Sequence, residues 1–216
     1  MALGFWEGAT ENSDLCTELL SDIESRNLSL HEDTIFVIDG GKGAQKALKM
    51  RFGKSLVLQR CTVHKCRNIE SHLPEQYRRG ARMRYNRAIG RSTYEDAKKG
   101  LTALEKWLQG INESAAKSLR EAFDDLLTLH KINIPIALRT ALRSTNAIES
   151  LFSKVRYREK NIRRWRNSNM RQRWLGTVLL HCEKTFNRVR GFKEIEDAVC
   201  AIKNFRNVVA SKEKVA

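Results

Sequence analysis

The sequence lacks the features that mark secreted and membrane proteins. None of its apolar runs approaches the length that crosses a bilayer. Its first thirty residues hold six acidic side chains and no basic start followed by an apolar core, which excludes a secretory signal. The five cysteines are an odd, scattered set, which fits a reducing cytoplasm better than a disulfide framework. We therefore expect a cytoplasmic protein that does not contact membranes.

Proline is scarce, at two residues in 216, and the hydrophobic fraction of 41% is ordinary for a folded protein. Few prolines mean few obligatory breaks in helices, and this chain length suffices for a buried core. The composition predicts a globular, mostly helical protein that forms one domain, or one domain with a sizeable insertion.

Acidic residues are nearly missing from residues 139–190, which hold 3 Asp and Glu against 14 Lys and Arg. The whole chain has a net charge of +15. A basic segment rich in Arg and interleaved with aromatic residues attracts phosphate backbones. The alternative is a solvated helix surface that only keeps the protein in solution. We expect nucleic-acid binding, with these candidate contacts: Arg156, Arg158, Lys160, Arg163, Arg164 and Arg166.

A strand, a turn, a helix and a second strand are predicted near the start of the chain. Residues 34–38 are β-branched and aromatic and end at Asp39, which two glycines follow. A helix over 43–51 leads to a second apolar strand at 55–58, and a right-handed crossover makes the two strands parallel. Asp39 then lies at the carboxyl end of a strand, where ligands and metals collect in open α/β sheets.

The second strand runs into Cys61 and His64, which places a thiol and an imidazole close to the sheet edge that carries Asp39. Together with Cys66 and His72 they could form a zinc site, although structural zinc usually takes two well-separated ligand pairs. A Cys61 nucleophile paired with His64 is a further alternative.

Before the first predicted strand, residues 3–6 read as a short strand. Asn12 or Ser13 can cap the helix that follows, which ends near Asn27.

Between residues 69 and 138 the pattern is helical only. The stretch 76–88 is basic and has few core positions, so we expect an exposed helix there. Ser92 and Glu95 form a capping box for a second, strongly amphipathic helix. A third helix is expected from 113 to about 129, before a proline breaks the pattern.

Residues 143–156 are predicted to form a helix capped by Ser144 or Thr145, with Glu149 in its first two turns. The apolar positions expected to face inward are Ile148, Leu151, Phe152 and Val155. Glu149 could serve only to complement the helix dipole. Because Asp39 lies at a strand end in the same basic chain, a metal site is the alternative, since Mg²⁺ ions held by such carboxylates cut phosphodiesters.

Six motifs, in this order along the chain, resemble those of the Mutator-type transposases of bacterial insertion sequences: LGFWEGATEN, VIDGGKGAQKAL, QRCTVHKCRNI, HLPE, RSTNAIES and RRW. The resemblance covers nearly the whole chain. It implies an α/β fold of the ribonuclease H-like type, a mixed sheet with helices that is interrupted by an all-helical insertion. Residues 1–68 would be part of the α/β core, 69–138 the insertion, and 139–216 the helical carboxyl-terminal part that carries Glu149 and the basic face.

The resemblance also implies roles for four residues. Asp39 is similar to the second catalytic aspartate of the family and Glu149 to the catalytic glutamate, and together they would bind Mg²⁺ or Mn²⁺. Cys61 and His64 resemble a Cys-x-x-His signature of the same catalytic region. The implied reaction is metal-dependent hydrolysis and strand transfer at element ends. The implied partners are terminal inverted repeats, target DNA, and a second copy or a full-length transposase.

One part of the family pattern is missing. The first catalytic aspartate of the family lies on a strand upstream of the segment that Leu3–Asn12 resembles. We therefore expect a carboxyl-terminal part of a transposase, without its first strand or strands and inactive alone. The alternative is a non-catalytic DNA-binding regulator derived from a transposase. In either case Asp39 and Glu149 should lie at one site, with the intervening helices projecting to one side.

Overall fold

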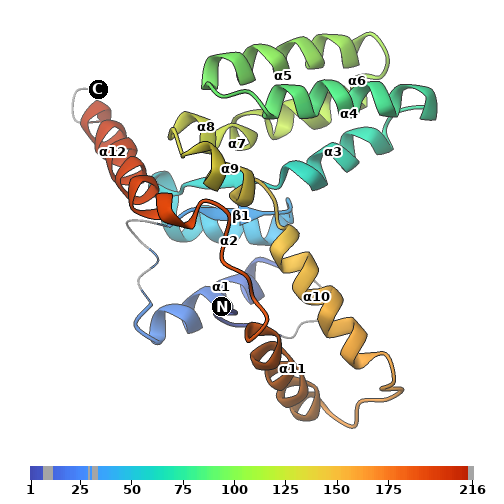
Figure 1. Ribbon diagram of the computed structural model, residues 1–216, viewed down its shortest axis with the longest axis vertical. Helices are drawn as coiled ribbons and strands as arrows, with labels where there is room; N and C mark the ends of the chain where they lie inside the picture. Colours follow the sequence, from blue (N-terminus) through green and yellow to red (C-terminus); the bar gives the residue numbers. More distant parts are fainter. Residues whose placement is uncertain (7–11, 29, 31–33, 214–216) are drawn as a thin grey trace.

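The computed structural model describes residues 1–6, 12–28, 30 and 34–213 of the chain, and in these it has a mostly helical α/β fold with one small sheet (Figure 1). The strands are β1 (Phe36–Ile38) and β2 (Leu58–Arg60), and the 3₁₀ turns are η1 (Gly53–Ser55) and η2 (Phe192–Glu194). The α-helices are α1 (Ser13–Ser25), α2 (Lys42–Phe52), α3 (Thr62–Ser71), α4 (Glu75–Ile89), α5 (Tyr94–Gln109), α6 (Glu113–Glu121), α7 (Phe123–Leu126), α8 (Thr128–Lys131), α9 (Ile136–Leu142), α10 (Asn146–Glu159), α11 (Ser168–Glu183) and α12 (Ile195–Glu213).

The predicted strand, helix and parallel strand are confirmed. β1 and β2 pair in parallel with Val37 opposite Gln59, and α2 connects them. β2 begins later than the predicted strand at 55–58, because the chain first forms the 3₁₀ turn η1. Gly53 starts this turn with a φ of +51°, which side-chain-bearing residues rarely adopt. The structure is thus mostly helical with one small parallel sheet, which is compatible with the α/β class predicted from the sequence.

The N-terminal residues form no strand within residues 1–6, so that prediction is wrong. Phe5 packs instead against the buried face of α11, and the Ala2 N–H donates to Glu183 Oε1 at 2.6 Å. The apolar residues here are buried by a helix from the other end of the chain, which a local pattern does not reveal. The helix that follows is capped as expected, because Asn12 accepts a hydrogen bond from the Leu15 N–H at 2.8 Å.

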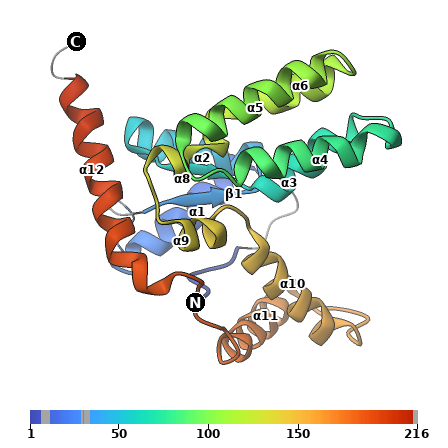
Figure 2. The same ribbon diagram turned by 45° about the horizontal axis from the view of Figure 1, so that its top comes forward.

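Helices α4, α5 and α6 stack into a layer of their own, well away from the α10–α11 pair (Figures 1 and 2). Contrary to expectation, α4 is not simply exposed, since it buries Ala81, Tyr85 and Ala88 against α5. The fit is close: a Cβ at Gly100 would lie 2.8 Å from the Ala88 Cβ. Small residues let the two helices approach, while the basic side chains of α4 occupy its outer face.

The capping box at the start of α5 lies one residue later than predicted. Thr93, and not Ser92, has the extended backbone of an N-cap, and its hydroxyl oxygen accepts a hydrogen bond from the Asp96 N–H at 3.1 Å.

The single helix expected over 113–129 is divided into α6, α7 and α8, with breaks at Ala122 and Leu127. The buried Gln59 of β2 satisfies backbone groups at the second break. Its amide nitrogen donates to the Leu126 carbonyl at 3.1 Å, and its amide oxygen accepts from the Leu129 N–H at 3.1 Å. The breaks therefore allow this segment to follow the edge of the sheet.

Helix α12 packs against α8 and α9. Its Ala198 and Ile202 join a core cluster with Val57 and residues of these two helices. Helix α10 pairs with α11, which covers Val155 but leaves Ile148 and Phe152 about half exposed. The prediction that Ile148 and Phe152 face inward is therefore wrong.

Within the residues described, none of the helices is long and apolar enough to cross a membrane.

The buried His130 of α8 gives the fold a pH dependence that can be measured. Burial and the nearby Arg139 lower the pKa of His130 to about 4, whereas the ordinary value is near 6.5. Between these pH values the unfolded chain binds a proton that the folded chain does not. We therefore expect the free energy of unfolding to fall as the pH decreases from about 6.5 to about 4.

Chemical denaturation at a series of pH values measures this effect. His130→Leu should reduce the pH dependence in this window, while the same change at the exposed His72 should leave it as in the parent chain. An unchanged pH dependence in His130→Leu would contradict this assignment.

Candidate active site

Three segments that are distant in the sequence meet at the carboxyl edge of the two-stranded sheet. The Cys61 N–H, just beyond β2, donates to the carbonyl of Ile38, the last residue of β1, at 2.7 Å. The next N–H, that of Thr62, donates to the Arg143 carbonyl at 2.9 Å, in the segment that leads to α10. This edge therefore joins the end of β1, the start of α3 and the start of α10.

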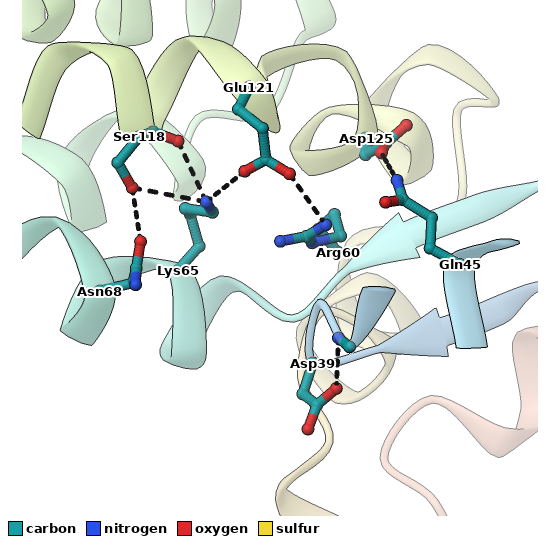
Figure 3. Close-up of polar contacts among 9 residues, drawn as sticks. Asp39, Gln45, Arg60, Lys65, Asn68, Ser118, Glu121 and Asp125 are labelled. Atoms are coloured by element: carbon teal, nitrogen blue, oxygen red, sulfur yellow. Dashed lines mark hydrogen bonds and ion pairs between the residues drawn. The ribbon is translucent and has the colours of Figure 1, made fainter. Parts of the chain in front are cut away.

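Asp39 is exposed and follows β1 directly. Its Oδ1 accepts a hydrogen bond from the Gly41 N–H at 3.1 Å, which fixes the carboxylate at the start of α2. Gly40 has a φ of +110°, and a Cβ there would lie 2.2 Å from an Arg60 guanidinium nitrogen. The turn thus requires glycine next to Asp39. In Figure 3 the Asp39 side chain lies below the strands and points away from the Lys65–Glu121 pair, which lies above them.

Glu149 lies on the first turn of α10, where its carboxylate meets residues of α3. Its Oε1 lies 3.7 Å from His64 Nδ1 and 3.3 Å from the Thr145 hydroxyl, and its Oε2 lies 3.7 Å from an Arg67 guanidinium nitrogen. Thr145 is the N-cap residue of α10, but its side chain makes no capping hydrogen bond. Its hydroxyl instead faces Cys61, at 3.3 Å from the sulfur.

Cys61 is fully buried, and its sulfur is surrounded by donors. Sγ lies 3.3 Å from His64 Nδ1 and accepts from the Thr145 N–H at 3.4 Å. Burial alone would raise the pKa of the Cys61 thiol, but the hydrogen bonds from His64 and Thr145 outweigh burial and lower this pKa. The sulfur therefore has more thiolate character than that of an ordinary buried cysteine.

The four predicted site residues differ in their placement. Cys61, His64 and Glu149 each offer a ligand atom, and these atoms lie within 4.8 Å of one another, the one such group of three among the residues described. Asp39 occupies the same edge of the sheet but is outside this group. The zinc alternative that included Cys66 and His72 is wrong, because Cys66 packs into the α4–α6 core and His72 ends α3, exposed.

The oxygen ligands that Mg²⁺ or Mn²⁺ requires are available in part at this edge. Asp39 and Glu149 are carboxylates of the right chemistry, whereas the sulfur and nitrogen of Cys61 and His64 suit softer ions. Asp39 and Glu149 are therefore candidate ligands for such an ion.

The basic side chains proposed to contact nucleic acid all lie exposed on or just beyond α10. Some have protein partners. Arg158 lies 2.9 Å from His181 Nε2 on α11, and the Lys160 ammonium lies 4.3 Å from the centre of the Tyr157 ring. Arg139 belongs to the same basic segment but is buried, and it donates twice to the Ser92 carbonyl at 3.0 Å. Arg139 therefore stabilises the fold rather than adding to the exposed basic face.

A comparison with known protein families gives a match over residues 1–189 to the model described as "Transposase, Mutator family". The chain belongs to the Mutator family of transposases. The match includes Asp39, Cys61, His64 and Glu149, together with nearly all of the basic segment.

Curated relatives agree with this assignment. The transposase for insertion sequence element ISRM3 of Rhizobium meliloti (strain 1021) is 30% identical over 158 residues, 71% of this chain and 38% of the relative. The transposase for element IST2 of Acidithiobacillus ferrooxidans is 28% identical over 170 residues, 79% of this chain and 55% of the relative. The transposase for insertion sequence element IS256 in transposon Tn4001 of Staphylococcus aureus is 27% identical over 183 residues, 82% of this chain and 45% of the relative. This Mutator-family chain thus spans about half the length of the relatives it matches.

Sequence reasoning missed an ionic cluster, formed by the buried Arg60 and Lys65 with the exposed Glu121, that ties the helical layer of this Mutator-family chain to the site. Lys65 of α3 donates to Glu121 Oε2 at 2.6 Å and to the Ser118 carbonyl at 3.0 Å, and Arg60 lies 3.3 Å from Glu121 Oε1 (Figure 3). Burial alone would raise the pKa of Glu121, but the hydrogen bond from Lys65 and the two positive charges outweigh it and lower this pKa. The partners are 56 and 61 positions apart, so no local spacing indicates the cluster.

The Lys65–Glu121 pair should respond unequally to removal of its two partners. Lys65 is 5% exposed and Glu121 51% exposed. Glu121→Gln leaves a buried ammonium without a carboxylate, which should cost about 1–3 kcal/mol, less than for a fully buried pair. Lys65→Met leaves only a carboxylate that water can reach, so it should cost less. Urea denaturation of both variants measures the difference.

The exposed Glu113, which lies 3.5 Å from Arg120, offers a matched control. Glu113→Gln should change the unfolding free energy by less than about 0.5 kcal/mol. A larger loss in Lys65→Met than in Glu121→Gln would contradict the view that the buried charge decides the cost.

Proposed function

We propose that this chain forms part of the catalytic domain of a DDE-type transposase with a ribonuclease H-like fold. In this proposal Asp39 and Glu149 supply two carboxylates to a site that cuts and joins DNA at the ends of an insertion sequence. The observation that carries the proposal is the meeting of the Asp39 and Glu149 segments at one edge of the sheet, through Cys61 and Arg143. Family membership and the names of the relatives support it.

The residues of the site are suited to hold two carboxylates in fixed positions. The Gly41 N–H orients Asp39, and Thr145, His64 and Arg67 surround the carboxylate of Glu149. A bound Mg²⁺ or Mn²⁺ would supply activation of a water or a 3′ hydroxyl and would neutralise charge on the phosphate. The contribution of the protein is to hold both carboxylates at the sheet edge, where solvent reaches them.

A non-catalytic DNA-binding regulator remains the second candidate, and one observation favours it. Two metal ions about 4 Å apart need a ligand that bridges both. The ligand group formed by Cys61, His64 and Glu149 contains one carboxylate, and Asp39 is outside it. A chain with this set of acids could bind element ends and associate with a second copy or with a complete transposase without cutting DNA.

Catalysis by these residues can be tested with the longest product of the reading frame that contains the 216 residues. Mg²⁺-dependent nicking of a DNA fragment that carries the element ends is the measurement. Asp39→Asn and Glu149→Gln should each reduce nicking by at least about 100-fold, because each removes a metal ligand. Asp14→Asn, on the exposed surface of α1, is the control and should leave the rate unchanged.

The 216-residue chain alone should bind the same fragment without robust nicking. Nicking that persists in both site variants would show that other acids carry the reaction. Binding without nicking by every product of the reading frame would favour the regulator.

The basic face should bind DNA through phosphates. We expect binding of duplex DNA with weak sequence preference and an affinity that falls steeply with salt. Changing Arg163, Arg164 and Arg166 together to Ala should reduce the slope of log K against log salt by up to about 3, roughly 0.9 for each lost phosphate contact.

A control variant removes the same charge from the distant helical layer, with Ala at the exposed Lys99, Lys106 and Lys117. It should keep the slope of the parent chain. Equal slopes in the parent chain and the triple arginine variant would show that the face serves only to keep the protein in solution.

A further inference from the structure

Four polar atoms, two from the start of α3 and two from the start of α10, form a small cluster in which five of the six separations are 3.3–3.7 Å. The Thr145 hydroxyl oxygen is 3.3 Å from each of Cys61 Sγ, His64 Nδ1 and Glu149 Oε1. The sulfur is 3.3 Å from His64 Nδ1, which is 3.7 Å from Glu149 Oε1. The remaining separation, between Cys61 and a Glu149 carboxylate oxygen, is within 4.8 Å.

The five short separations are of the size found between neighbouring ligand atoms of a tetrahedral metal ion. A regular tetrahedron with edges of 3.3–3.7 Å has its centre roughly 2.0–2.3 Å from each corner, and zinc binds nitrogen and oxygen at about 2.0–2.2 Å and sulfur at about 2.3 Å. We propose that Cys61, His64 and Glu149 bind a zinc-class transition-metal ion, with the Thr145 hydroxyl or a water at the fourth corner.

One distance in the cluster is long for a hydrogen bond. Hydrogen bonds between oxygen atoms are usually 2.5–3.0 Å long, whereas the Thr145 hydroxyl lies 3.3 Å from the Glu149 carboxylate. The hydroxyl has one proton and can donate to only one of its three neighbours. Its equal distances from a sulfur, a nitrogen and an oxygen atom suit a shared ion.

The surroundings are those of a metal site that prefers zinc to magnesium. The thiolate and imidazole ligands suit zinc, whereas magnesium prefers oxygen ligands. Outer contacts also orient the ligands, as they do around many metal sites. The Thr145 N–H donates to Cys61 Sγ, and Arg67 lies near the Glu149 oxygen that faces away from His64. Cys61 is fully buried, which shields the sulfur from solvent.

A metal ion here would fasten α10 to the end of β2 and to α3. It would also engage the Glu149 oxygen that the proposed catalytic metal needs, so zinc and magnesium would compete for Glu149. The zinc site itself does not depend on the proposed catalysis, because its ligands and distances are the same in a non-catalytic DNA-binding chain.

The experiment measures metal binding by the purified 216-residue chain under reducing conditions. Competition with a chromophoric chelator should give one Zn²⁺ per chain, and millimolar Mg²⁺ should not displace it. Cys61→Ser, His64→Asn and Glu149→Gln should each weaken Zn²⁺ binding by more than about 100-fold, beyond the loss expected for an outer contact. Cys200→Ser and His72→Asn change exposed residues of the same types and should bind as the parent chain does.

Cobalt substitution provides a measurement that does not require the variants to fold. Co²⁺ in the parent chain should show the thiolate charge-transfer band and the visible spectrum of a tetrahedral site. Absence of stoichiometric Zn²⁺ binding, absence of the thiolate band, or unchanged affinity in a folded Cys61→Ser variant would each overturn the proposal.

Discussion

The position of Cys61 is the constraint on which the site depends. Its backbone N–H continues the pairing of β2 with β1, since it donates to the carbonyl of Ile38, directly before Asp39. Its side chain faces the N-terminus of α10, where the sulfur contacts Thr145. One residue thus connects the strand that carries the aspartate to the helix that carries Glu149. The next residue adds a second link, because the Thr62 N–H donates to the Arg143 carbonyl in the segment that leads to α10.

The helical layer is attached to the site from the other side of β2. Gln59 satisfies backbone groups where the chain passes from α7 to α8, and Lys65 reaches Glu121 at the end of α6. Gln59 and Lys65 are polar and buried, so each would be costly to leave without its partner. The sheet is short, and buried side chains of β2 and α3, more than strand pairing, fix the helices around it.

Local sequence patterns predict the parts of this fold that local physics determines. The strand before Asp39, the helix after it and the Asn12 cap depend on neighbouring residues, and these features are in the structure. The pairing of Cys61 with Thr145 spans 84 positions and could not be found by spacing. The exposure of Ile148 and Phe152 was also not predictable, because an apolar stripe does not reveal how much of it a partner helix will cover.

The central claim is that the segments joined at Cys61 bring Asp39 and Glu149 to one metal site. Crystals of the chain soaked with Mn²⁺, with anomalous diffraction recorded to locate the ion, test it directly. Our account predicts a manganese position with a carboxylate oxygen from each of the two residues, or two such positions about 4 Å apart. It would be contradicted by well-ordered Asp39 and Glu149 carboxylates more than about 12 Å apart, a separation that two ions at that spacing could not bridge.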